Sequence, residues 1–194
     1  MRTGLCALCA FVTVSPVQIC ADDITDELEA ARAAYANGNV SEAIQALDMA
    51  RQLLMEKTAS GLANLFPECE GLVRGEPESS AAGQAMFGGM VTAECRYTED
   101  GGDGWLNVKY SAKSPMLQSV LMMFSMPGMT AGSGMKLERV AGKRALVERD
   151  GKSGKVQIVH EGEMLVEIEF GDLEFEKVTA FVAVIPWDDL SSML

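Results

Sequence analysis

The spacing of apolar residues divides the chain into a helical front and a β-rich body. Between residues 22 and 67, apolar side chains recur every three or four positions, which is the period of one helix face. They are Leu28, Ala31, Tyr35, Ala43, Leu47, Ala50 and Leu54. Asn37-Gly38-Asn39 interrupts this pattern, Ser41 is suited to cap the second segment, and Phe66-Pro67 ends it. The front is therefore predicted to be a pair of helices.

From about residue 84 the period changes to the alternation of half-buried strands. The clearest alternating runs are 91–97, 106–110, 144–149, 155–161 and 163–170. Turn-rich connections such as Asp150-Gly151-Lys152-Ser153-Gly154 separate them, as in antiparallel hairpins. A last helical pattern carries Phe175, Val178, Phe181 and Val182. We expect Asp172 to cap this helix, and the helix to cover the buried face of the sheet.

The predicted fold class is α+β. A helical hairpin occupies residues 22–67, and a largely antiparallel sheet of five or six strands with flanking helices occupies residues 81–194. Residues 68–80 mix proline, glycine and charge, so we expect a linker there.

Several residues of the front resemble one tetratricopeptide-type helix-turn-helix unit. They are Ala31, Ala34, Tyr35, Gly38, Glu42, Ala43, Ile44, Leu47 and Ala50. A single unit cannot stack into a repeat array, so the resemblance implies a hairpin that docks on the sheet or on a partner. An ordinary antiparallel helix pair is the alternative. The whole layout is similar to secreted bacterial proteins with a helical front, and loosely to the Mog1/PsbP-type sandwich, which implies a fold but no active site.

Residues 1–21 have the layout of a cleavable export signal. Arg2 provides a positive start, residues 4–14 are almost entirely apolar, and Ala21 precedes the acidic Asp22-Asp23. The apolar run is shorter than the roughly 20 residues that a membrane span needs. We therefore expect a periplasmic protein without a membrane-spanning helix.

The net charge of the chain argues against one class of partner. The chain has 28 acidic and 16 basic residues, which gives a formal net charge of −12. Such a surface repels phosphate backbones, so the composition argues against nucleic-acid binding.

Cleavage of the export signal would change the number of cysteines in the protein. If cleavage follows Ala21, the cysteines that remain are Cys69 and Cys95. A pair of cysteines in an oxidising compartment favours a structural disulfide between them, with two separate buried thiols as the alternative. Two cysteines and the single histidine, His160, are too few for a zinc site.

A methionine-rich segment, residues 116–126, follows Ser114-Pro115, which is a suitable helix start. Three interpretations stay open. The helix packs on the sheet with methionine as an adaptable core residue, or it presents an interaction surface through Met122, Met126 and Met129. In the third interpretation the same three thioethers bind Cu(I), for which they are soft ligands.

No motif points to catalysis or to a cofactor. His160 shares a strand face with Val156 and Ile158, which favours a structural histidine, and the glycine-containing run 83–89 lacks the ending of a phosphate-binding loop.

The sequence therefore favours a non-enzymatic periplasmic binding protein of unspecified oligomeric state. Its expected partner is an envelope protein or an apolar ligand, contacted through the methionine-rich helix, the hairpin or both. A Cu(I)-binding protein is the alternative.

Overall fold

A computed structural model describes residues 21–81, 90–125 and 134–193 of the 194-residue chain. Its helices are α1 (Ala21–Ala36), α2 (Val40–Ala63), α4 (Met116–Ser125), α5 (Phe175–Val184) and α6 (Trp187–Ser191). Its strands are β1 (Leu72–Arg74), β2 (Glu78–Ala81), β3 (Val91–Glu99), β4 (Trp105–Ala112), β5 (Lys136–Val140), β6 (Lys143–Asp150), β7 (Ser153–His160) and β8 (Met164–Gly171). These elements confirm the predicted α+β class. Within the described residues, no helix has the length and apolar character needed to cross a membrane.

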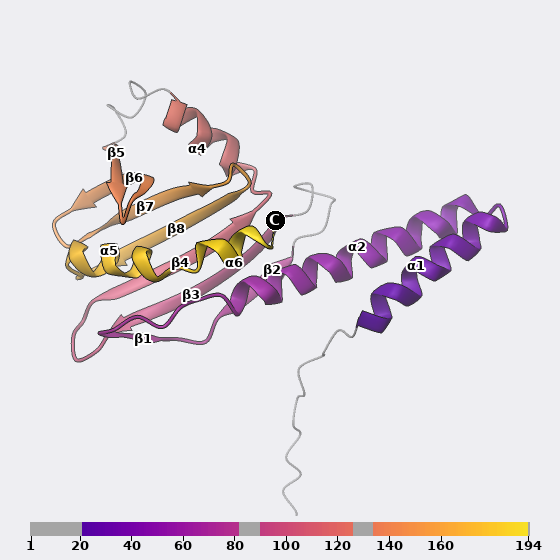
Figure 1. The fold of residues 1–194 in the computed structure, drawn as a ribbon, viewed down its shortest axis with the longest axis horizontal. Coiled ribbons are helices and arrows are strands. Elements are labelled where there is room, and N and C mark those ends of the chain that lie inside the picture. Colours follow the sequence, from indigo (N-terminus) through magenta and orange to yellow (C-terminus); the bar gives the residue numbers. More distant parts are fainter. Residues whose placement is uncertain (1–20, 82–89, 126–133, 194) are drawn as a thin grey trace, which may run out of the picture.

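The strands form one antiparallel sheet in the order β1-β3-β4-β8-β7-β6-β5, with β2 also paired to β3 (Figure 1). Strands β1 to β4 make one half of the sheet and β5 to β8 the other. The halves meet where β4 pairs with β8, in a register that runs from Trp105 opposite Gly171 to Ala112 opposite Met164. The sheet has eight strands, which is slightly more than the five or six predicted.

The segment predicted as a linker is part of the sheet, and that prediction is wrong. β1 and β2 pair in succession with the same edge of β3, with Arg74 opposite Tyr97 and Ser79 opposite Ala93. Between them the amide of Gly75 donates a hydrogen bond of 2.7 Å to the carbonyl of Arg96. The segment was missed because an edge strand that is short and mostly polar lacks the apolar alternation of a central strand.

The main core lies on one face of the sheet, beneath α5, α6 and the C-terminal part of α2. Alternation in β8 places Val166, Ile168 and Phe170 in this core and turns Glu167 and Glu169 to the other face, as predicted. Aromatic contacts join the layers: Phe66 stacks on Tyr110 at 4.4 Å and Tyr97 meets Phe181 edge-on at 4.8 Å between ring centroids. On the opposite face, α4 covers a smaller apolar cluster. Its members are Leu117, Val120, Leu146 and Leu165.

Two helix starts differ from the predicted ones. The side chain of Asn39, and not that of Ser41, caps α2 by accepting a hydrogen bond of 3.5 Å from the amide of Glu42. Helix α5 begins at Phe175, directly after Glu174. Asp172 has a φ of 52°, so it turns the chain out of β8 in the left-handed region instead of capping the helix.

The turn between β5 and β6 offers a test of backbone strain. Val140 pairs with Lys143, and the two residues between them, Ala141 and Gly142, have φ values of 48° and 82°. Asn-Gly suits such a turn, whereas alanine is strained in it. We expect Ala141→Asn to raise the free energy of unfolding by about 0.5–1 kcal/mol, measured by urea denaturation. Gly142→Ala should lower it by about 1 kcal/mol or more. Changes of the same sign in both variants would contradict this account.

Candidate functional site

The two helices of the hairpin pack on each other through small side chains. The buried alanines are Ala31 and Ala34 in α1 and Ala43, Ala46 and Ala50 in α2. Methyl groups at these positions allow the two helix backbones to approach closely. The interior of the hairpin is therefore thin and is largely filled by the alanines themselves.

Most large apolar side chains of the hairpin lie outside this interior, whereas Ile24 of α1 is buried. About half or more of each is exposed: Leu28, Tyr35, Val40, Ile44, Leu47, Met49 and Leu54. Tyr35 reaches 73% exposure. In an ordinary helix pair the large residues are buried and the small ones are exposed, so the hairpin reverses the usual arrangement.

One stripe of α2 passes from the core into open solvent. Leu62 is fully buried in the core beneath the sheet. Leu54, Leu47 and Val40 precede it at steps of seven or eight residues, which keeps all four on one side of the helix. Figure 1 shows that the N-terminal part of α2, with α1 beside it, projects beyond the sheet. Among the described residues, the side of α2 that forms core at its root therefore continues without a covering element.

Helix geometry places the exposed stripes of both helices on one side of the hairpin. At about 100° per residue, Leu28 and Tyr35 of α1 are turned by roughly 80° from the alanines of that helix. The exposed stripe of α2 is turned from its own alanines by roughly the same angle in the same sense. Because the helices are antiparallel, equal rotations bring the stripes to the same side. We call this surface the bare face, and it consists of Leu28, Tyr35, Val40, Ile44, Leu47 and Leu54.

A pocket lies where the bare face meets the body of the protein. It has a volume of about 240 Å³, and Leu54, Met55 and Thr58 of α2 line one side of it. Val91 and Ala112, at the ends of β3 and β4, line the other side, and the charged residues Arg51, Lys113 and Glu163 also border the pocket. The hairpin therefore meets the body at a concavity of mixed apolar and charged lining that has room for one more side chain.

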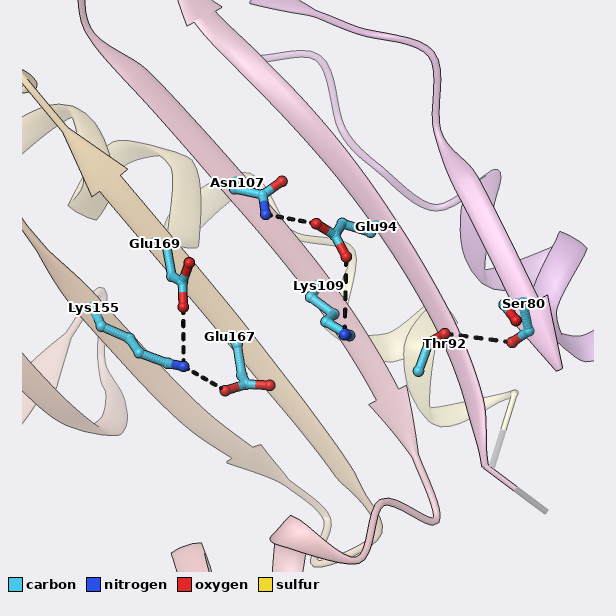
Figure 2. A network of polar contacts seen from close by, with 8 residues as sticks. All are labelled: Ser80, Thr92, Glu94, Asn107, Lys109, Lys155, Glu167 and Glu169. Atoms are coloured by element: carbon cyan, nitrogen blue, oxygen red, sulfur yellow. Dashed lines mark hydrogen bonds and ion pairs between the residues drawn. The ribbon is translucent and has the colours of Figure 1, made fainter. Parts of the chain in front are cut away.

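The polar face of the sheet carries a ladder of paired charges (Figure 2). Lys155 Nζ lies 2.9 Å from a carboxylate oxygen of Glu167 and 3.1 Å from one of Glu169. Asn107 donates a hydrogen bond of 2.6 Å to Glu94. Such cross-strand pairs stabilise a solvated sheet face. Among the described residues, no group of three histidine, cysteine or acidic side chains is placed to hold a metal ion.

The methionine-rich helix, α4, packs mainly against the sheet. Leu117 and Val120 are buried against the sheet, in agreement with the interpretation as a packing helix. Met122 is 54% exposed and lies among the exposed polar residues Gln118 and Ser119. The other two residues of the proposed surface and Cu(I) site, Met126 and Met129, lie outside the described residues. The Cu(I) site stays a prediction.

The structure does not contain the predicted disulfide, because Cys69 and Cys95 are both free thiols. The register gives a physical reason. The backbone partner of Cys69 is Leu72, which pairs with Glu99. Glu99 is four residues from Cys95, which is about 13 Å along the strand, whereas bonded cysteines have Cα atoms within about 7 Å. Burial raises the pKa of both thiols, so neither is activated as a nucleophile.

His160 packs beneath α6 as a structural histidine. It is 8% exposed, and its ring centroid lies 5.2 Å from that of Trp187. Its Nε2 lies 2.9 Å from the hydroxyl of Ser191, which in turn donates a hydrogen bond to Glu161. In a catalytic triad the carboxylate orients the histidine. Here the carboxylate contacts the serine, so the group lacks the arrangement of a triad.

Comparison with protein-family models, with curated proteins and with solved structures found no match for this chain. The bare face is therefore argued from its own geometry. Sequence periodicity alone does not reveal it, because alanines and large residues count equally in one apolar stripe. Separating them by size would have shown two neighbouring stripes on each helix.

Because small residues are buried and large ones exposed in the hairpin, substitutions at two positions one helical turn apart should change stability by different amounts. Ala50 is buried between the helices, whereas Leu47 is 51% exposed. We expect Ala50→Leu to force the helices apart and to lower the free energy of unfolding by about 1–3 kcal/mol. Leu47→Ala should change it by less than about 0.5 kcal/mol at a protein concentration low enough that no partner covers this position. Denaturant titrations measure both, and a larger loss for Leu47→Ala would contradict the assignment of inside and outside.

The environment of His160 predicts a dependence of stability on pH. Burial lowers the pKa of its imidazole, so the folded protein favours the neutral ring. An unfolded histidine takes up its proton near pH 6.5, and below about that pH the unfolded state binds more protons than the folded state. The free energy of unfolding therefore falls as the pH decreases below about 6.5.

His160→Gln retains a polar side chain next to Ser191 but cannot titrate. We expect the loss of stability between about pH 7.5 and about pH 5.5 to be smaller in this variant than in the natural protein. Denaturant titrations at the two pH values measure the difference. An equal loss in both proteins would show that His160 does not contribute.

Proposed function

We propose that this protein is a non-enzymatic binding protein of the bacterial periplasm that docks a partner through the bare face of its helical hairpin. The observation that carries the proposal is the stripe of α2 that begins in the core at Leu62 and, within the part of the chain that the structure describes, runs exposed to Val40. Apolar surface left in water costs about 25 cal/mol per Å² relative to burial. A partner that covers the stripe recovers this free energy.

The size of the bare face supports a binding role. At about 100 Å² for each half-exposed side chain, its six residues expose on the order of 600 Å² of mostly apolar surface. The largest apolar patches on soluble monomers measure roughly 300–600 Å² and are often functional. The bare face is at the upper end of that range.

The bare face is a better docking surface than the methionine-rich helix. On α4 the exposed Met122 is separated from other apolar side chains by Gln118, Ser119 and Ser125, all of which are exposed. On the hairpin, the large side chains of two helices adjoin one another. Around Arg51, which lies between Leu47 and Leu54 on the same side of α2, they form the kind of apolar area that interface cores require.

The proposed location depends on the sequence of residues 1–21. Their charge, short apolar run and small residue before an acidic start are typical of an export signal. In the periplasm, the expected partner is an envelope protein that presents a complementary apolar surface.

Site-specific photo-crosslinking in cells that produce the protein tests the docking surface. A photo-reactive residue at Ile44 or Leu47 should give a covalent adduct with the partner, because both side chains belong to the bare face. Met49 is the matched control: it is in the same helix and is as exposed as Leu47, at 51%, but lies on the opposite side. We expect no adduct from position 49.

The proposal is tested by comparing the adducts formed from positions 44, 47 and 49. If positions 44 and 47 give no adduct, the bare face has no partner and the proposal fails. Adducts of equal yield from positions 47 and 49 would show contact without a preferred side, which also contradicts the proposal.

A further inference from the structure

We propose that the partner of the bare face is the bare face of a second copy of this chain, so that two hairpins form a four-helix bundle. This inference rests on the proposed function, since it names the partner that the bare face docks. It follows from the shape of the face, from the charges around it and from its area.

The shape of the bare face is complementary to that of the same face on a second copy of the chain. It consists of two parallel stripes, one on each of two antiparallel helices that pack closely through alanines. A two-fold axis through the face places a second pair of stripes over the first, and each apolar side chain then has a partner. Four helices around a shared apolar core are a stable arrangement. A single partner helix would cover the groove between the stripes but leave their outer edges in water.

The charges of the hairpin are arranged so that two copies can approach. The protein is acidic overall, with a net charge of −12, and a random pairing of two copies would be repulsive. Helix geometry places Asp26 and Glu42 on the sides of α1 and α2 that point away from the bare face. The residues within and beside the face have both signs: Arg51 lies between Leu47 and Leu54 on the same side of α2, Arg32 lies next to the stripe of α1, and Asp48 lies next to that of α2. A border of mixed sign is self-complementary, because each copy supplies both members of an ion pair.

The area of the bare face is sufficient for a dimer. A standard interface buries about 800 Å² on each partner, of which a little over half is apolar. The bare face supplies on the order of 600 Å² of mostly apolar surface. Border residues and the pocket beside Leu54 bring the available surface to the standard size.

Sedimentation equilibrium of the purified protein tests the inference. We expect the natural protein to have twice the mass of the chain at micromolar concentration. Leu47→Glu places a carboxylate in the interface twice by symmetry, and should raise the dissociation constant of the dimer by about a hundredfold or more. The matched variant Met49→Glu adds the same charge on the opposite side of α2, and should leave the dissociation constant within about threefold of the natural value. Both positions are exposed, and circular dichroism verifies that each variant is folded.

Three outcomes would overturn the inference. The natural protein could have the mass of a single chain at all concentrations up to several hundred micromolar. The dimer could survive Leu47→Glu unchanged. Photo-crosslinks from Ile44 or Leu47 could have a mass other than twice that of the chain, which would support the proposed function while excluding a second copy as the partner.

Discussion

The antiparallel pairing of β4 with β8 determines most of this structure. The other described ladders join strands within residues 72–112 or within residues 136–171, whereas this one joins the two halves. It sets Tyr110 beside Val166 and Leu106 beside Phe170, and so it creates a single apolar face wide enough for α5, α6 and the root of α2. Without this pairing, Leu62 would have no core to enter, and the hairpin would have no fixed base.

Much of the fold is predictable because the relevant signals are local. The alternation in β8 and the helical period of α2 depend only on neighbouring residues, and both were predicted correctly. β1 and β2 were missed because their strand structure comes from the edge of β3 and not from their own side chains. The cap of α2 at Asn39 instead of Ser41 shows the same limit on a smaller scale, since both residue types are good caps and the competition between them is decided by the turn.

The candidate site is less predictable, because it depends on where one element ends relative to another. Leu62 and Leu47 belong to the same stripe and look alike in sequence, yet one is buried and the other is about half exposed. The difference arises because α2 has 24 residues and is about 36 Å long, so its N-terminal part passes the edge of the sheet. The missing disulfide has a similar cause: the number of cysteines is visible in the sequence, but the separation of Cys69 and Cys95 is set by the register of β1 on β3.

The two ends of α2 differ in how firmly the rest of the protein holds them. Near the root, the end of the Met193 side chain lies against Gly61, and the helix shares the core of the sheet. At the outer end the described contacts of α2 are with α1 alone, through alanines that bury little surface. Backbone amides of Ala43 and Ala46 should therefore exchange with solvent by local opening, while those near Leu62 exchange only when the whole domain unfolds. A single unbroken helix thus joins the most persistent part of the molecule to its most easily opened part, and any partner held at the tip also sets how often that tip unwinds.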